Sequence, residues 1–181
     1  MIEDKILILR FKAGSSTALA RIYEKYENYL LTVAMGLLNE TNAAEDVVHD
    51  VIVKFAQSAD TLKLRGNLRA YLAKCVVNRV RDLIRVRLRH PVVGLEEAGL
   101  PDCEGEGSEQ SAIIHEDMLR LNRGLAQLSY EQREAIMLRV HSEMTFKQIA
   151  QLQDVSANTV RGRYRYGLEK LRSLLNSEVT I

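Results

Sequence analysis

The sequence predicts an all-α fold made of two small helical domains joined by a flexible acidic linker, with a helix-turn-helix in the second. Apolar residues recur at steps of three and four along most of the chain, and no stretch alternates as a strand does. Only two of the 181 residues are proline, so long helices meet few interruptions. Both prolines lie in residues 91–116, a stretch that is also rich in acids and glycine and therefore predicts a linker.

Helical spacing divides the first domain, predicted over residues 1–90, into four segments. Ser16 is the predicted N-cap of the second segment, after a Gly-Ser-Ser break. Asn42 and Glu45 form a capping-box pattern at the start of the third. Residues 57–67 lack the pattern and predict a loop. The four segments begin near residues 2, 16, 42 and 68.

The second domain, predicted over residues 117–181, contains three sequence signals for helix starts. Ser129 and Thr145 each precede a glutamine by three residues, as in a capping box, and Ser156 can cap the last long helix. Residues 145–171 therefore have the form of a helix-turn-helix, with a short helix, a tight turn and a longer helix.

Charge is partitioned along the chain, although the net formal charge is only +1. Residues 1–90 hold 15 basic and 10 acidic side chains, and residues 118–181 hold 10 and 6. Residues 91–117 hold 8 acids and no Lys or Arg. Two basic ends separated by an acidic strip favour two polyanion-binding domains, although an uneven surface charge without function gives the same counts.

The last long helix has one apolar and one polar face. Asn158 and Arg161 lie opposite the apolar face, and these side chain types bond adenine and guanine edges in the major groove. Gly162 lacks a side chain, which lets the helix lie close to a groove wall, while Thr159 and Arg163 flank the face and suit phosphates. The alternative is a helical hairpin with a solvated basic face. The predicted DNA-binding residues here are Ser156, Asn158, Thr159, Arg161, Gly162, Arg163 and Arg165.

The helix predicted from residue 68 to residue 89 carries a polar, mostly basic stripe. It holds seven Lys or Arg and a single acid, Asp82. Aromatic and amide groups among cations suit single-stranded nucleic acid, because bases stack on the ring while cations hold phosphates. Arg79 falls nearer the apolar face and is expected to contact a neighbouring helix. The stripe consists of Tyr71, Lys74, Asn78, Arg81 and Arg85.

Sequence motifs in both halves of the chain resemble those of one protein family. Residues 128–139 (LSYEQREAIMLR), 145–150 (TFKQIA) and 156–172 (SANTVRGRYRYGLEKLR) resemble the promoter-reading C-terminal domain of extracytoplasmic-function (ECF) sigma factors, in the sigma-70 superfamily. Residues 44–51 (AEDVVHDV) resemble the family's polymerase-docking helix, and residues 68–78 (LRAYLAKCVVN) resemble its minus-ten-reading helix. The family often has Trp at the position of Tyr71.

This resemblance implies a sigma factor that directs core RNA polymerase to specific promoters, binds two promoter elements and stabilises the melted strand. The first domain would dock on polymerase and read and melt the minus-ten element, and the second would read the minus-thirty-five element. The loop before residue 68 would capture an unstacked base, with Arg65 and Asn67 as participants. An anti-sigma factor is a further partner that the family suggests. The implied polymerase-binding residues are Asp46, Val47, His49, Asp50 and Val51.

The sequence shows no catalytic or metal-binding pattern. It lacks a phosphate-cradling glycine loop and a nucleophile motif, and its four histidines are not spaced as metal ligands with Cys or acids. We therefore expect no enzymatic activity, cofactor or metal. Cys75 and Cys103 form no CxxC pair, and Cys75 is interpreted as a small core residue. With no signal-peptide pattern or membrane-length apolar run, we expect a cytoplasmic protein without membrane insertion.

Two other functions fit part of the sequence. A dimeric promoter-binding regulator would use the second half to bind duplex DNA and the first half as a sensor or dimerisation module. A nucleic-acid-processing enzyme would need a catalytic constellation that the sequence lacks. The basic, aromatic helix at residues 68–89 favours the sigma factor, because a sensor module has no need of it.

Overall fold

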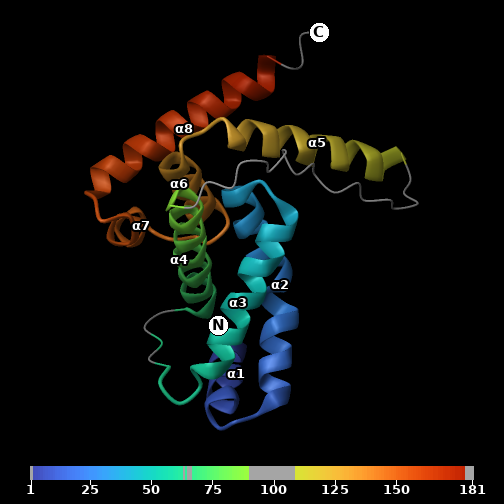
Figure 1. The fold of residues 1–181 in the computed structure, drawn as a ribbon, viewed down its shortest axis with the longest axis vertical. Coiled ribbons are helices and arrows are strands. Elements are labelled where there is room, and N and C mark those ends of the chain that lie inside the picture. Colours follow the sequence, from blue (N-terminus) through green and yellow to red (C-terminus); the bar gives the residue numbers. More distant parts are fainter. Residues whose placement is uncertain (1, 63, 65–66, 90–108, 178–181) are drawn as a thin grey trace. The chain divides into compact units, whose positions relative to one another are not determined.

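The computed structural model describes residues 2–62, 64, 67–89 and 109–177. Within these ranges all regular structure is α-helical, which confirms the predicted fold class (Figure 1). The chain divides into two compact units, one holding α1, α3, α4 and most of α2, the other holding α5 to α8. The helices are α1 (Ile2–Lys12), α2 (Ser16–Leu38), α3 (Thr41–Gln57), α4 (Leu68–Arg89), α5 (Glu109–Ala126), α6 (Tyr130–Val140), α7 (Phe146–Gln153) and α8 (Ala157–Ser177).

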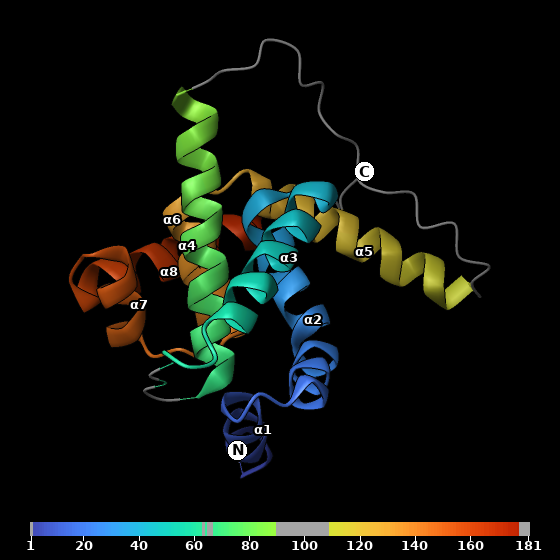
Figure 2. The ribbon, with the colours of Figure 1, turned by 60° about the horizontal axis from the view of Figure 1, so that its bottom comes forward.

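The first unit is held together by an aliphatic core with aromatic contacts at its edges. Helices α2 and α3 lie side by side in both ribbon views (Figures 1 and 2). Phe11 of α1 stacks on Phe55 of α3, with ring centroids 4.6 Å apart. The Arg69 guanidinium of α4 lies 4.3 Å from the ring centroid of Tyr29 on α2. The fully buried core side chains include Ile22, Leu30, Val33, Val47, Leu68, Leu72, Val76 and Val77.

Two helix starts in this unit differ from the sequence prediction. The side chain of Ser15, not Ser16, accepts a hydrogen bond from the Ala18 backbone amide at 3.3 Å, so the cap lies one residue earlier. Helix α3 begins at Thr41, which places Asn42 inside the helix and rules it out as the cap. A left-handed residue precedes each helix, Gly14 at φ 83° and Asn39 at φ 56°, so the chain turns and re-enters helix directly afterwards.

The last eight residues of the predicted linker belong to a helix in the structure. Helix α5 begins at Glu109, so residues 109–116 are helical where a linker was predicted. These residues contain neither glycine nor proline, and the next glycine is Gly124, so nothing in their backbone chemistry stops the helix from starting early. The preceding linker residues, 91–108, lie outside the described residues.

In the second unit α8 is the central element, packing on α5, α6 and α7, while α6 also packs on α7. Lys170 of α8 donates a hydrogen bond to the Gln127 carbonyl at 2.6 Å. Helices α8 and α6 approach closely at Gly167, where an added Cβ would lie 3.0 Å from the Ile136 side chain. The core includes Leu125, Leu128, Ala135, Leu138, Ile149, Ala150, Val160 and Leu171.

Candidate nucleic-acid and polymerase interfaces

The polar stripe of α4 is accessible along most of its length. Lys74, Asn78 and Arg85 are exposed, and Tyr71 and Arg81 are half-buried. Arg85 donates to Asp82 at 2.8 Å, but both side chains are more than half exposed, so this pair is screened by solvent and weak. The stripe therefore presents two amide or aromatic groups among cations, the arrangement predicted from the sequence.

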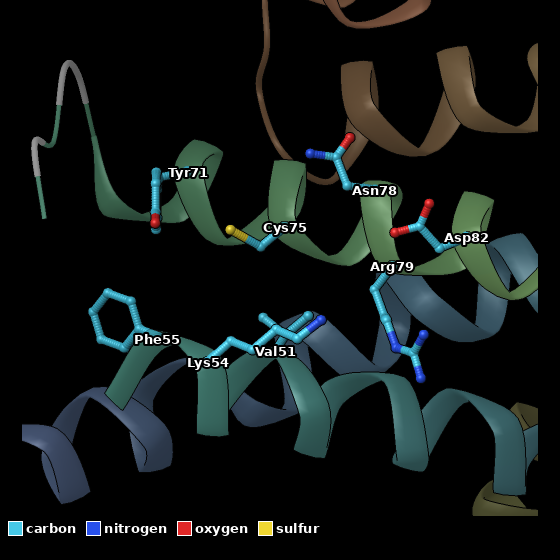
Figure 3. A pocket seen from close by; sticks show the side chains of 8 residues that line it. All are labelled: Val51, Lys54, Phe55, Tyr71, Cys75, Asn78, Arg79 and Asp82. Atoms are coloured by element: carbon cyan, nitrogen blue, oxygen red, sulfur yellow. The ribbon is translucent and has the colours of Figure 1, made fainter. Parts of the chain in front are cut away.

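A pocket of about 200 Å³ lies between α3 and α4, beside this stripe (Figure 3). Phe55 and Tyr71 form one end, with ring centroids 6.2 Å apart. Arg79 lies at the other end, where it contacts α3 through an ion pair with Asp50 at 2.6 Å. The lining residues are Val51, Lys54, Phe55, Tyr71, Cys75, Asn78, Arg79 and Asp82.

The charged side chains in the pocket wall are Lys54, Arg79 and Asp82, and its other lining residues are apolar or neutral. Burial raises the pKa of the Tyr71 phenol and of the Cys75 thiol, so both groups are neutral near pH 7. Cys75 is half-buried in the pocket wall, so its interpretation as a core residue is only partly right. The aromatic rings suit a flat apolar group such as a nucleotide base, and Lys54 suits its phosphate, while the Asp82 carboxylate is paired with Arg85.

The loop before α4 is described only in part. The Asn67 side chain accepts a hydrogen bond from the Ala70 backbone amide at 2.7 Å and so caps the N-terminus of α4. Its carboxamide NH₂ group keeps its two donors, because only the oxygen is used by the cap. Arg65, the other predicted loop participant, lies outside the described residues.

The predicted polymerase-binding residues of α3 divide into exposed and buried groups. Asp46 and His49 are exposed, and Asp50 is half-buried in its ion pair with Arg79. Val47 and Val51 are only 2% and 3% exposed, because they belong to the apolar stripe that packs into the first unit. These two side chains therefore offer little surface to a partner in this fold, and the accessible part of the set is acidic and polar.

Helices α7 and α8 form the predicted helix-turn-helix. Thr145 caps α7 in a reciprocal capping box with Gln148, and Ser129 does the same with Gln132 at α6. Asp154 closes α7 in the left-handed conformation, with φ 53° and ψ 48°, which a short polar side chain tolerates. The Ser156 hydroxyl accepts from the Thr159 amide at 3.0 Å and caps α8. The three caps and the turn thus follow from local sequence.

Gln153, the last residue of α7, joins three helices by hydrogen bonds. Its amide donates to the Glu131 carbonyl of α6 at 3.0 Å, and its oxygen accepts from Arg163 of α8 at 2.7 Å. Arg163 is half-buried in this contact. One of its guanidinium nitrogens is thus engaged in fixing the motif, which makes it a structural residue as well as a predicted phosphate contact.

The polar face of α8 is open at its first two turns. Asn158, Thr159, Arg161 and Arg165 are exposed. Asn158 accepts a hydrogen bond from Arg161 at 3.0 Å, which joins the two predicted base-reading side chains. An added Cβ at Gly162 would meet only one atom within 4 Å, the edge of the Tyr166 ring at 4.0 Å, so the fold itself does not require glycine there.

Sequence reasoning missed four residues of these surfaces. Lys54 enters the pocket from α3, and Gln153 braces the helix-turn-helix. Arg139 and Phe146 form a cluster with Arg161, with the two guanidinium groups 5.1 and 5.9 Å from the ring centroid. The capping box predicts that Phe146 lies at the start of α7. The local sequence pattern does not predict that side chains from α6 and α8 meet its ring.

The described part of the chain holds neither a metal-ligand cluster nor a helix that could span a membrane. Its His, Cys, Asp and Glu side chains include no group of three or more placed to hold a metal ion. Of the helices that the structure describes, none combines the length and apolar character needed to cross a membrane.

The fold and these surfaces define a helical DNA-binding protein of two units, one with a helix-turn-helix. The Sigma-70 region 2 family matches residues 22–90, and the Sigma-70 region 4 family matches residues 124–173. The ECF RNA polymerase sigma factor ShbA of Streptomyces griseus is 30% identical over 135 residues, covering 72% of this chain and 70% of that protein. The chain belongs to the ECF RNA polymerase sigma factors of the sigma-70 superfamily. It is a transcription initiation factor that directs RNA polymerase to promoters.

More distant relatives match nearly the whole chain. The RNA polymerase sigma factor CnrH of Cupriavidus metallidurans is 26% identical, covering 97% of this chain and 95% of that protein. The structure of CnrH in complex with the cytosolic domain of CnrY has a TM-score of 0.70 at 22% identity, covering 97% of this chain and 98% of CnrH. RpoE of Bartonella quintana, solved with the anti-sigma factor NepR, has a TM-score of 0.65 at 24% identity, covering 86% and 97%. These two structures share the fold.

Proposed function

We propose that the two units read different promoter elements. Residues 1–90 dock on core polymerase and read and melt the minus-ten element, the unit that holds α5 to α8 reads the minus-thirty-five element, and the residues before α5 connect the two. The observation that carries this division is the contrast between the two polar helices. The stripe of α4 borders a pocket with aromatic walls, whereas the polar face of α8 is open and fits a groove of duplex DNA.

The first unit binds the opened strand through α4 and the pocket. A base leaves the stack, enters between α3 and α4 and stacks on Tyr71, while Lys54 and Lys74 hold its phosphates. Asn78 lines the same pocket and offers both a donor and an acceptor to a base edge. Asn67, Arg81 and Arg85 extend the contact along the strand.

The second unit lays α8 in the major groove. Arg161 and Asn158 contact base edges, Arg165 follows one turn later, and Gly162 allows close approach. Ser156 and Thr159, at the positive end of the helix, contact a phosphate. Arg163 contacts a phosphate through the guanidinium N–H groups that do not bond Gln153.

Core polymerase binds the outer face of α3 through Asp46 and His49, with Asp50 as a weaker contributor because of its ion pair with Arg79. We also propose an anti-sigma partner, supported by the two solved relatives, one in complex with CnrY and one with an anti-sigma factor. The chain works in the cytoplasm, where polymerase and promoters are, and has no catalytic activity of its own, since polymerase performs the chemistry.

Transcription in vitro tests the division. Core RNA polymerase and a genomic promoter library are incubated with and without the chain, and new start sites are mapped. We expect start sites that share two upstream elements. Replacing both Arg161 and Arg165 by Ala should weaken dependence on the upstream element alone. The matched control removes two exposed cations elsewhere, Lys12 and Arg123, and should leave both elements intact. Polymerase-independent duplex binding without new start sites would contradict the proposal.

A further inference from the structure

An aromatic ring at the start of α7 gathers two arginines. The Arg139 guanidinium lies 5.1 Å from the ring centroid of Phe146, and the Arg161 guanidinium lies 5.9 Å from it. Both side chains are exposed, and neither forms an ion pair with a described residue. Two cations near one ring repel each other, so the cluster is a site where a negative group, such as a DNA phosphate, is favoured.

The ring itself is held in place from two sides. Tyr164 meets Phe146 edge to face, with centroids 5.5 Å apart. Phe146 is the first residue of α7, directly after the capping residue Thr145, so its backbone is fixed by the capping box. Arg139 is also fixed, because it donates to the Met144 carbonyl at 3.0 Å. The ring is therefore a rigid surface for the remaining arginine.

Arg161 is restrained by two contacts that act in different directions. Its guanidinium donates to Asn158 along α8, and it packs against Phe146 of α7. An arginine side chain has many rotamers and loses this freedom when it bonds a base edge. A side chain whose rotamers are already restricted before it binds loses less, and it also adapts less well to a wrong base.

We propose that Phe146 is a positioning residue that orients Arg161 and so sharpens base discrimination at the upstream element. The proposal rests on the proposed function, in which Arg161 reads that element. Phe146 acts through Arg161 and does not itself touch a base. An aliphatic residue of similar volume would fill the space beside Tyr164 but would offer no ring face to the guanidinium.

The test uses the full chain with core polymerase on promoters randomised in the upstream element. Base preference at each position is measured for the wild type, Phe146→Leu, Phe146→Tyr, Arg161→Ala and the double variant Phe146→Leu/Arg161→Ala. Ile149→Val, a small change in the buried face of the same helix, is the control for a loss of packing alone. Thermal unfolding shows that each variant is folded.

We expect Arg161→Ala to abolish the preference at one base pair. Phe146→Leu should lower the preference at that same pair by about two- to fivefold, the strength of an exposed cation–ring contact. Phe146→Tyr should keep it, and Phe146→Leu should add no loss when Arg161 is already Ala. A uniform fall at all positions in Phe146→Leu, like that of Ile149→Val, would overturn the positioning role while leaving the proposed function intact. If Arg161→Ala changes no preference, the reading role of Arg161 fails, and this proposal fails with it.

Discussion

The two polar helices of this sigma factor, α4 and α8, have similar composition but different surroundings. Helix α4 lies beside α3, and its polar residues border a pocket of about 200 Å³. Helix α8 presents Asn158, Arg161 and Arg165 to solvent on an open face. A pocket accepts a base that has left the stack, and an open face fits base edges within duplex DNA. Under the proposed function, the surroundings of a basic helix, more than its residues, decide which form of DNA it suits.

The two helices also differ in how their polar side chains are restrained. In α4 the neighbour that braces the site is a whole helix, through the Arg79–Asp50 ion pair and the Phe55–Tyr71 contact. In α8 single side chains restrain the site. Gln153 accepts a hydrogen bond from Arg163, and the ring of Phe146 contacts the guanidinium of Arg161. Substitutions in the first unit should therefore change strand opening, and those in the second should change duplex recognition.

The largest expected effect comes from Tyr71→Ala. Stacking on an aromatic side chain contributes about 1–3 kcal/mol per base, so open complexes should fall about fivefold to a hundredfold. Permanganate reactivity of thymines in the melted strand measures this. At saturating holoenzyme, Arg161→Ala should leave the same reactivity unchanged, which separates the two units.

Tyr71 also contacts Phe55, so the substitution lowers stability as well as stacking. Tyr71→Phe keeps the ring and serves as the matched control, with opening expected to stay near the wild type. Wild-type opening in a folded Tyr71→Ala protein would contradict the role of the pocket and remove the contrast with α8.

Gly162→Ala should separate stability from function in the second unit. The added methyl meets only the edge of the Tyr166 ring, at an ordinary contact distance of 4.0 Å, and alanine favours helix by up to about 1 kcal/mol, so the free energy of unfolding should rise. If α8 lies against the groove, the methyl causes overpacking of about 1–3 kcal/mol, and upstream-dependent transcription falls about fivefold or more. Gly167→Ala is the contrasting variant, because its methyl would lie 3.0 Å from Ile136 and 3.2 Å from Gln132, so these side chains must shift and stability should rise less than in Gly162→Ala. A Gly162→Ala protein that is more stable and fully active would argue against close approach to DNA.

Features of the structure that rest on neighbouring residues were predictable from the sequence. The caps at Ser129, Thr145 and Ser156 depend on residues three positions away, and the turn at Asp154 depends on its own backbone preference. The caps predicted at Ser16 and Asn42 were wrong by a residue or more, because a left-handed residue upstream set the start of each helix. The start of α5 was missed since composition alone marked the linker.

Contacts between distant segments were not predictable in the same way. Periodicity already placed Val47 and Val51 on the apolar face of α3, but the family resemblance added them to the polymerase-binding set. Both side chains are buried in the first unit, so packing accounts for their position, and their contact with polymerase stays a prediction. Gln153 and Phe146 act through partners on α6 and α8, and no local pattern marks such a partner. Arg79 is the exception, because its position near the apolar face predicted a contact with a neighbouring helix.

A smaller effect is expected on the polymerase-docking face, where Asp46 and Asp50 should behave differently. Asp46→Ala should weaken holoenzyme assembly by up to about fivefold, as for an exposed charge contact. Asp50→Ala should weaken it less, since that carboxylate already pairs with Arg79, and it should lower stability by less than about 1 kcal/mol because the pair is partly exposed. Titration of labelled core polymerase measures both, with Glu45→Ala on the same helix as a charge-matched control. Equal effects of all three would indicate general electrostatic attraction in place of a defined contact.

The smallest effect concerns the Cys75 thiol, which reports on the pocket without a substitution in the pocket itself. Burial raises the pKa of Cys75, so at pH 8 less of it is thiolate than in an unfolded chain. Alkylation by iodoacetamide should therefore be slower in the folded protein and should speed up as the pH rises above the usual thiol range. A Cys103→Ser background removes the second thiol, and the urea-unfolded chain is the reference. In the holoenzyme, DNA with a pre-melted minus-ten region should slow the reaction further, whereas a duplex carrying only the upstream element should not. Equal protection by both would mean that the pocket does not distinguish opened strand from duplex, and the contrast between α4 and α8 would then rest on α8 alone.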